Sequence, residues 1–577
     1  MERDLDDGTN GFPTSSNAAD LRREADWWRG CVLYQIYPRS FQDSNGDGIG
    51  DLAGITRRIA HVASLGVDAI WISPFMTSPM KDFGYDIANY RDVDPIFGTL
   101  DDFDALVAEA HRLGLKVIID QVLSHTSSLH PWFVTSRSCR DNDKADWYVW
   151  ADPRPDGTPP NNWLSVFGGT SWEWDSRRRQ YYLHNFLASQ PDLNFHNEAV
   201  RRALLDDVRF WLERGVDGFR LDTANFYFHD AALRDNPPLG EELRSEVMAS
   251  RNQPYNFQDH VHDKNRPEVL TFFGELRALL DEYGAMAVGE VGERIRGVEL
   301  MAEYTTGSDR LQMCYAFDFL SGNMPSPAAI RRTIERFEEA GPGGWACWAF
   351  SNHDVERHAS RWTAGGRDTE KTLRLAAGIL MTLRGSVCLY QGEELGLTEA
   401  DIAYEDLVDP YGINFWPEVK GRDGCRTPMA WEAGEDHAGF SAARPWLPVP
   451  SEHAARAVDA METDPGSLLH FYRRLIGFRR GHPALGRGAI TFLDAPEGVL
   501  AFVRDVGSGE EGPGERLLCV FNLGEEPVRF DLPAGLDPQA LDGHGFAGRR
   551  EGAGIHLGDH DGFIGALSPG AHGFGRI

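Results

Sequence analysis

The chain has 577 residues, 42% of them hydrophobic and 25% charged, which is typical of a globular protein with a large core in two to four domains. Its formal net charge of −31 argues against nucleic acids and anionic membranes as partners, because both bind basic surfaces. A small neutral substrate fits this charge better.

The N-terminal segment, residues 1–25, is acidic and polar, and we expect it to be a disordered tail. It lacks the basic and apolar regions of a signal peptide, and no run of about 18 apolar residues occurs in the sequence. The seven cysteines include no Cys-x-x-Cys pair and are odd in number, which favours reduced thiols over disulfides or structural zinc. These features predict a cytoplasmic protein, and they leave open whether it is a monomer or a dimer.

Short apolar runs alternate with helical patterns along most of the chain. Continuous apolar strands separated by helices indicate a parallel sheet covered on both faces, and eight such units predict an α/β fold of the (β/α)8 TIM-barrel type. A doubly wound sheet is the alternative, but no Gly-x-Gly-x-x-Gly turn follows the first run, so no nucleotide or other organic cofactor is expected. The runs are residues 31–37, 69–72, 117–120, 218–222, 286–290, 312–317, 345–350 and 387–390.

Two long segments interrupt this alternation. Residues 126–196 are rich in Trp, Asp, Pro and Gly and are too long for an unstructured loop, so they predict a small inserted domain after the third strand. Residues 230–267, after the fourth strand, suggest a lid or pocket wall. Both segments would overhang the C-terminal rim of the barrel, where barrel enzymes build their active sites.

The last part of the chain changes character after an amphipathic helical pattern at residues 468–480. Short strand-like runs separated by Gly, Pro and Glu predict an antiparallel β-domain over residues 485–577. The barrel itself would then comprise residues 26–125 and 197–484. The strand-like runs are residues 489–493, 499–504, 517–523 and 528–532.

The stretch 218–225, Gly-Phe-Arg-Leu-Asp-Thr-Ala-Asn, places charge at a strand end. Alternate residues of a strand share a face, so Arg220 and Asp222 point the same way. An adjacent guanidinium favours the ionised carboxylate, which is the form that a nucleophile needs. A buried structural ion pair is the alternative that this stretch alone leaves open.

Three acidic residues stand at the ends of three predicted strands: Asp222, Glu290 and Asp354. Retaining glycoside hydrolysis uses one carboxylate as nucleophile and one carboxyl group as acid and then base. Glu290 lies in the apolar stretch Ala-Val-Gly-Glu-Val, where burial and nearby negative charge would raise its pKa and suit proton donation. Asp354 could bind sugar hydroxyls and stabilise an oxocarbenium-like transition state.

Four motifs occur in order along the chain: Asp-Gln-Val-Leu-Ser-His at 120–125, the stretch at 218–225, Val-Gly-Glu-Val at 288–291 and Phe-Ser-Asn-His-Asp at 350–354. They resemble the four ordered sequence regions of the α-amylase family, glycoside hydrolase family 13. A fifth, Gln-Pro-Asp-Leu-Asn at residues 190–194, resembles the region typical of its oligo-1,6-glucosidase and α-glucosidase branch. The resemblance extends from about residue 32 to residue 446.

The resemblance implies roles for these residues. Asp222 would be the nucleophile, Glu290 the general acid/base and Asp354 the transition-state stabiliser. The family usually has Asn before the His of its first motif, where it supports the site by hydrogen bonding, and here that position is Ser124. The residues implied to line the same subsite are His125, Arg220 and His353.

Two further segments resemble the parts of this branch that close the pocket around a terminal glucose. Asp82 and Arg426 would bind its far hydroxyls, and Tyr85 would stack on its ring. Phe167 would add an apolar wall, with core packing as the alternative. A closed pocket implies removal of one glucose at a time. The segments are Lys-Asp-Phe-Gly-Tyr-Asp at 81–86 and Gly-Cys-Arg-Thr-Pro at 424–428.

The loop at residues 43–51 begins like an EF-hand, but its twelfth position is Gly54 and not Glu. In relatives the same loop binds Ca²⁺ or Mg²⁺ in a structural role, and a metal-free turn is the alternative. The implied oxygen ligands are Asp43, Asn45, Asp47, the carbonyl of Ile49 and Asp51.

Together these features predict a retaining, exo-acting α-glucosidase that cleaves terminal α-1,4 bonds of short substrates such as maltose, with transglucosylation as a side reaction. In this branch a Val after the nucleophile goes with α-1,6 specificity, whereas Thr or Ala goes with α-1,4, and here the residue is Thr223. An oligo-1,6-glucosidase or a sucrose- or trehalose-acting relative is the alternative. A non-catalytic, transporter-associated barrel is disfavoured because the three carboxylates are present.

Overall fold

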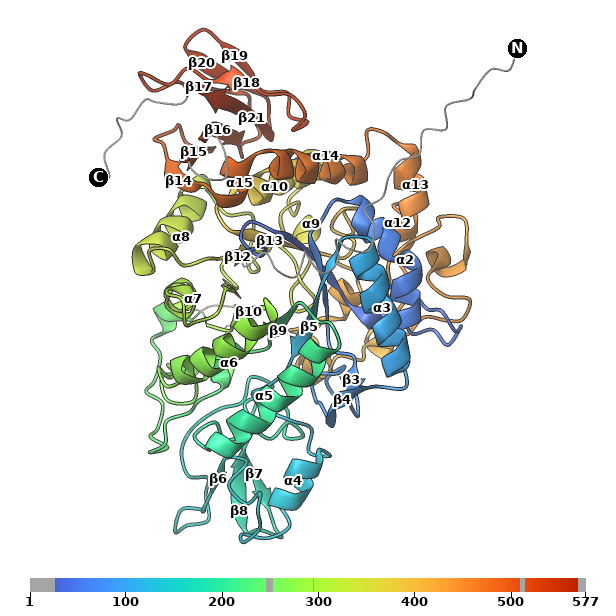
Figure 1. The fold of residues 1–577 in the computed structure, drawn as a ribbon, viewed down its shortest axis with the longest axis vertical. Helices are drawn as coiled ribbons and strands as arrows, with labels where there is room; N and C mark the ends of the chain where they lie inside the picture. The colour runs from blue at the N-terminus through green and yellow to red at the C-terminus, as the bar shows by residue number, and fades with distance from the viewer. Residues whose placement is uncertain (1–25, 245–252, 294, 509–513, 569–577) are drawn as a thin grey trace.

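The computed structural model describes residues 26–244, 253–293, 295–508 and 514–568, so the predicted disordered tail, residues 1–25, lies outside the described residues. Eight parallel strands form the central sheet, hydrogen-bonded in the order β11-β10-β9-β5-β2-β1-β13-β12 (Figure 1). A parallel bridge between Cys314 and Ala346 connects its two ends, and the predicted barrel is confirmed. The strands are β1 (Val32–Ile36), β2 (Ala69–Ile72), β5 (Lys116–Gln121), β9 (Gly218–Leu221), β10 (Met286–Val291), β11 (Met313–Ala316), β12 (Cys347–Trp348) and β13 (Ser386–Tyr390).

Helices surround this sheet (Figure 1). Local sequence sets their ends: the Asn197 side chain accepts the Ala199 N–H at the start of α5, and Gly215, with φ of +99°, lies just beyond its end. None of the helices in the described ranges is long and apolar enough to cross a membrane. The main helices are α2 (Leu52–Ser64), α3 (Leu100–Arg112), α5 (Glu198–Glu213), α6 (Val269–Tyr283), α7 (Gly297–Thr305), α8 (Pro327–Ala340), α10 (Thr369–Thr382) and α14 (Leu468–Gly481).

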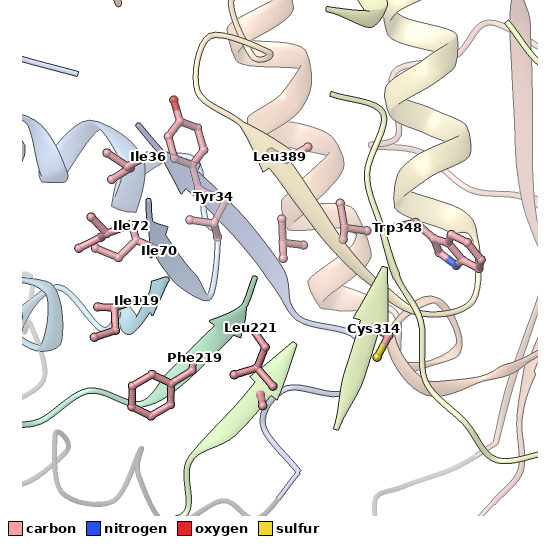
Figure 2. Close-up of a cluster of buried hydrophobic side chains, with 14 of the residues drawn as sticks. Tyr34, Ile36, Ile70, Ile72, Ile119, Phe219, Leu221, Cys314, Trp348 and Leu389 are labelled. Carbon is pink, nitrogen blue, oxygen red and sulfur yellow. The ribbon is translucent and has the colours of Figure 1, made fainter. Parts of the chain in front are cut away.

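The two faces of the barrel strands belong to different apolar cores. Phe219 and Leu221 lie in the large core between strands and helices (Figure 2). The intervening side chain of Arg220 is fully buried on the other face, and it contacts carboxylates. The alternation predicted for β9 is therefore confirmed, and it turns the polar residues of this strand toward the barrel interior.

The segment between β5 and α5 forms the predicted insertion, with one short helix and a three-stranded antiparallel sheet. Its end returns to the barrel rim, where the Leu193 N–H donates to the Ser124 carbonyl at 2.9 Å. The segment after β9 packs on it, since the Asn236 N–H donates to the Asn162 side chain at 2.8 Å. The elements of the insertion are α4 (Pro131–Ser136), β6 (Trp150–Ala151), β7 (Trp172–Asp175) and β8 (Gln180–Leu183).

The C-terminal part forms two antiparallel sheets at the end of the molecule opposite the insertion (Figure 1). Four strands coincide with the predicted runs: β14 (Ala489–Phe492), β15 (Val499–Val506), β16 (Glu515–Asn522) and β17 (Val528–Asp531). The long strand β21 (Asp561–Leu567) was not predicted. Its Gly562 weakens the strand signal, but a Cβ there would approach the Phe521 ring to 2.8 Å, so close packing explains this glycine. The other unpredicted strands are β18 (Gln539–Ala540), β19 (Arg549–Glu551) and β20 (Gly554–Leu557).

Candidate active site

The three predicted acids lie in the wall of one cavity at the C-terminal ends of the barrel strands. Asp222 directly follows β9, Glu290 lies near the end of β10, and Asp354 lies in the turn after β12. Parallel strands bring their C-terminal ends to one rim, which explains how residues so distant in sequence meet. The cavity is lined by Asp82, Tyr85, His125, Val166, Phe167, Phe186, Asp222, Thr223, Glu290, Phe317, Asp354, Tyr411 and Arg422.

The guanidinium group of Arg220 joins the carboxyl groups of this site. Its Nη1 donates to Asp222 Oδ1 at 2.6 Å and to Asp120 Oδ1 at 2.8 Å. Its Nη2 donates to Glu290 Oε2 at 2.5 Å and to the Tyr315 hydroxyl at 2.9 Å. A fully buried guanidinium needs such partners to offset its lost hydration. Arg220 thus forms the buried ion pair and at the same time holds Asp222 and Glu290 in one arrangement.

Thr223 completes this arrangement through an unusual backbone conformation. Its φ of +43° and ψ of +48° are left-handed, which is rare for a β-branched residue and costs about 1–3 kcal/mol. The conformation directs its N–H to Glu290 Oε2 at 3.0 Å. Both bonds to Glu290, from Arg220 and from Thr223, therefore reach Oε2, and Oε1 is the oxygen left to carry a proton.

The two carboxyl groups Glu290 and Asp354 have opposite electrostatic surroundings. Burial raises the pKa of Glu290 to about 8. The negative charges of Asp222 and Asp354 also raise it, whereas the Arg220 guanidinium lowers it. A raised pKa favours the protonated form of Glu290, which is the form that can act as an acid. Burial would also raise the pKa of Asp354, but His353 Nε2 at 3.1 Å and the nearby arginines hold it well below its usual range.

Arg422 is a residue of the cavity that sequence reasoning missed. Its Nη2 donates to Asp82 Oδ1 at 3.0 Å and to Asp409 Oδ1 at 2.8 Å. Its Nη1 donates to Asp354 Oδ1 at 3.1 Å, and its guanidinium lies 5.6 Å from the centre of the Phe167 ring. Arg422 lies just before the segment 424–428, and no local pattern distinguishes it from Arg426.

Arg426 occupies a different place from the one predicted. It is fully buried, donates through Nε to the His353 carbonyl at 2.7 Å and through Nη2 to Asp354 Oδ1 at 3.0 Å. It does not line the cavity, so Arg422 and not Arg426 is placed to reach a ligand. Arg220 and His353 were also predicted to line the subsite, but both are fully buried behind the cavity wall. There Arg220 contacts Asp222 and His353 contacts Tyr85, which are residues of the wall.

Tyr85 forms part of the cavity wall, and its ring is fixed from behind. The ring stacks on His353 with centroids 5.5 Å apart, and its hydroxyl lies 2.6 Å from His353 Nε2. The same hydroxyl donates to Asp120 Oδ2 at 3.1 Å. Gln35 donates to His353 Nδ1 at 2.6 Å, so Nε2 carries the ring proton and donates to Tyr85.

The insertion supplies an apolar side of the cavity. Phe167 contacts Phe186 and Tyr411 edge to face, with centroids 6.3 and 5.8 Å apart. The fifth motif reaches the polar side, because Gln190 Nε2 donates to Asp82 Oδ2 at 3.0 Å. Phe186 and Tyr411 were missed because isolated aromatic residues carry no sequence signal that separates a cavity from a core.

The predicted metal loop is closed by its own hydrogen bonds. Asp43 accepts three backbone N–H groups of the loop and the Ser441 hydroxyl, which uses about all the lone pairs of a carboxylate. Coordination by Asp43 would therefore have to replace one of these bonds. The described part of the chain also holds no group of three or more His, Cys, Asp or Glu side chains placed to bind a metal. The loop geometry by itself does not require an ion.

A (β/α)8 barrel with a guanidinium-bound carboxylate and a second carboxyl group of raised pKa in one rim cavity is an arrangement that suits a glycoside hydrolase. The family "Alpha amylase, catalytic domain" matches residues 35–488. The chain belongs to this family, glycoside hydrolase family 13.

Similar proteins extend this assignment over nearly the whole chain. A probable alpha-glucosidase of Rhizobium meliloti (strain 1021) is 61% identical over 91% of this chain and 94% of its own length. An oligo-1,6-glucosidase of Heyndrickxia coagulans is 38% identical over 88% of this chain and 94% of its own length. The crystal structure of the alpha-glucosyl transfer enzyme XgtA matches with a TM-score of 0.90 and 53% identity, over 94% of this chain and 100% of that one.

Proposed function

We propose that this enzyme is a retaining, exo-acting α-glucosidase that releases glucose from the non-reducing end of short α-1,4-linked substrates such as maltose. The observation that carries the proposal is the pairing of Asp222 and Glu290 by Arg220. One guanidinium holds a carboxylate beside a carboxyl group with a pKa near 8. Retaining glycosidases need their two groups about 5–5.5 Å apart, and a shared guanidinium suits that separation.

The proposed reaction has two displacements. Asp222 Oδ2 attacks the anomeric carbon while the glycosidic bond breaks, and Glu290 transfers its proton to the departing oxygen. Asp354 stabilises the positive charge that develops on the sugar. In the second step Glu290 takes a proton from water, whose oxygen attacks the anomeric carbon and releases Asp222. A sugar hydroxyl in place of water gives transglucosylation.

The ion pairs of Arg422 in the cavity wall are the support for exo action. Arg422 forms ion pairs with Asp82 and Asp354, and these contacts join a loop of the barrel's first half to the segment after β13. An ion-pair network in the cavity wall provides donors and acceptors for the hydroxyls of one sugar. We propose that Asp82 and Arg422 bind the far hydroxyls of the terminal glucose and that Tyr85 packs on its ring.

The preferred linkage is proposed from Thr223, which lines the cavity next to Asp222. We expect kcat/KM for maltose to exceed that for isomaltose by about tenfold or more, because a side chain beside the nucleophile contacts the leaving sugar. Glucose release should be measured on maltose, isomaltose, sucrose, trehalose and maltotriose. Analysis of the maltose products at high concentration would reveal trisaccharides if transglucosylation occurs.

The second candidate is an oligo-1,6-glucosidase, favoured by the similarity to the enzyme of that name. A clear preference for isomaltose would support it and contradict the α-1,4 proposal. A matched comparison is Thr223→Val, which keeps the side-chain shape and removes the hydroxyl. If Thr223 contributes to linkage choice, this variant should change the ratio of maltose to isomaltose activity.

We also propose that the loop 43–51 binds one structural Ca²⁺ or Mg²⁺. The support is the spacing of Asp43, Asn45, Asp47, Ile49 and Asp51, which places oxygen atoms at alternating positions. Dialysis against EDTA should lower the melting temperature, and Ca²⁺ or Mg²⁺ should restore it by mass action. An Asp47→Ala variant should lose this response, because it lacks one of the proposed metal ligands. Asp47 is exposed, so the substitution should leave the fold intact. An unchanged melting temperature would show that the loop's own hydrogen bonds suffice.

We propose a cytoplasmic location. All seven cysteines lie in the described part of the chain and none forms a disulfide, which suits a reducing compartment. Fractionation of the native cells with an antibody against the protein would test this, and recovery of the protein outside the cytoplasm would contradict it.

A further inference from the structure

Ser124 occupies the position where the family's first motif usually has Asn, and its surroundings are specific. The residue is buried, with 1% of its surface exposed. Its hydroxyl lies 2.9 Å from His125 Nδ1 and 3.0 Å from the Thr223 hydroxyl. Ser124 thus connects a histidine and a threonine of the cavity wall, and the direction of its two hydrogen bonds can be worked out from proton counting.

The proton of His125 is fixed by its outer neighbour. His125 Nε2 lies 2.9 Å from the Tyr85 carbonyl oxygen and 3.1 Å from Gln190 Nε2, whose two protons are donated to Asp82 Oδ2 at 3.0 Å and to the same carbonyl at 3.4 Å. The carbonyl oxygen can only accept, so Nε2 carries the proton of the His125 ring. Burial lowers the pKa of His125, so the ring is neutral and Nδ1 is an acceptor. The single hydroxyl proton of Ser124 is therefore donated to His125 Nδ1. The Ser124 oxygen is left as an acceptor toward Thr223.

The Thr223 hydroxyl also has one proton and two possible acceptors. One is the Ser124 oxygen at 3.0 Å, and the other is Asp222 Oδ2 at 3.3 Å. Asp222 Oδ1 already accepts from Arg220, so Oδ2 is the oxygen free to attack. Donation by Thr223 to Oδ2 would stabilise the carboxylate before the reaction and reduce its nucleophilicity.

We propose that Ser124 is a positioning residue that competes with Asp222 Oδ2 for the Thr223 hydroxyl proton and so weakens the 3.3 Å hydrogen bond from Thr223 to this oxygen in the resting enzyme. The proposal rests on the proposed role of Asp222 as nucleophile. The order of donation is Thr223 to Ser124, Ser124 to His125, and His125 to the Tyr85 carbonyl. No proton is transferred along this chain; it determines only where the hydroxyl hydrogens point.

The test is a double-mutant cycle on 4-nitrophenyl α-D-glucopyranoside. Ser124→Ala removes the acceptor, so Thr223 turns to Asp222, and we expect kcat/KM to fall about tenfold through kcat. The rate of covalent labelling by 5-fluoro-α-D-glucosyl fluoride, followed by intact mass, should fall by the same factor. In a Thr223→Val background no hydroxyl can turn to Asp222, so there Ser124→Ala should cost less than about twofold.

A merely structural role gives a different result. If Ser124 only supports the His125 ring, Ser124→Ala will cost the same in both backgrounds, and the proposal is overturned. Thr223→Ser retains the hydroxyl and is the matched control, so the tenfold effect should persist in it. Ser124→Cys keeps more of the side-chain volume, accepts hydrogen bonds weakly and repeats the test should Ser124→Ala melt at a much lower temperature than the parent enzyme.

The experiment separates this proposal from the proposed function. A parent enzyme that neither hydrolyses the α-glucoside nor takes up the fluorinated label on Asp222 would overturn both. A parent enzyme that is active and labelled, with no difference between the two backgrounds, would overturn the role of Ser124 alone.

Discussion

The kcat of an Asp222→Asn enzyme on maltose is expected to be at least about 10⁴-fold lower than that of the parent enzyme. The amide cannot form the covalent glucosyl intermediate, and it presents a neutral group to a transition state that develops positive charge. The fold should survive, because Asn has the same shape and its side-chain oxygen can still accept the bond from Arg220 Nη1. Glucose release, with circular dichroism as the check on folding, measures the effect.

The control for Asp222→Asn is the same substitution at Asp82, which lines the same cavity and contacts Arg422 and Gln190. Asp82→Asn weakens binding and should raise KM without abolishing turnover. The fluorinated glucosyl label should appear on the peptide that contains Asp222 in the parent enzyme and be absent from the Asp222→Asn variant. Substantial turnover by that variant, or labelling of a different carboxylate, would show that Asp222 is not the nucleophile.

A Glu290→Gln enzyme is expected to lose about 10²–10⁴-fold on maltose, because the departing sugar oxygen no longer receives a proton. Fluoride ion departs from glucosyl fluoride without protonation, so formation of the glucosyl-enzyme from this substrate should be nearly unimpaired. The second step still lacks its base and should become rate-limiting. Azide, which attacks without general-base help, should then accelerate turnover and yield glucosyl azide with retained configuration. Equal losses on maltose and glucosyl fluoride would contradict the acid role.

The dependence of kcat/KM on pH tests the role of Glu290 in the parent enzyme, without a substitution. The first displacement needs Glu290 protonated, and its pKa is raised to about 8 by burial. The active form is therefore present below this pKa and is lost as pH rises through it. We expect kcat/KM of the parent enzyme to fall above about pH 8 and to approach a tenfold loss per pH unit. With glucosyl fluoride this alkaline decline should be absent, and its persistence there would assign it to another group.

The barrel was predictable because its signals are local. Each strand is a short apolar run, and each is followed by a helix or a long insertion, as the structure shows for β5 and β9. The period-two geometry of a strand was enough to place Arg220 and Asp222 on one face, away from Phe219 and Leu221. Parallel order then carries Glu290 and Asp354 to the same rim, so the cavity could be inferred before any contact was seen.

The electrostatic state of the acids was only partly predictable. The raised pKa of Glu290 followed from its apolar stretch and from the expected neighbouring carboxylates. The low pKa of Asp354 did not, because it depends on His353 Nε2, Arg422 and Arg426, which approach it in space from the turn and from the segment after β13. The order of residues along the chain does not show which distant side chains lie close together in space.

The sequence by itself determined the strand order of the barrel, the faces of β9 and the identity of three acids at one rim. These features follow from apolar runs, from the period-two alternation of a strand and from the parallel direction of the strands, all of which can be read from short stretches of the chain. Only the tertiary structure decided which arginine reaches the cavity. Arg422 meets Asp82 across 340 residues, whereas Arg426 is turned to the His353 carbonyl. The structure likewise brought the Ser124 and Thr223 hydroxyl oxygens to 3.0 Å from each other, a separation that residue type and spacing do not encode.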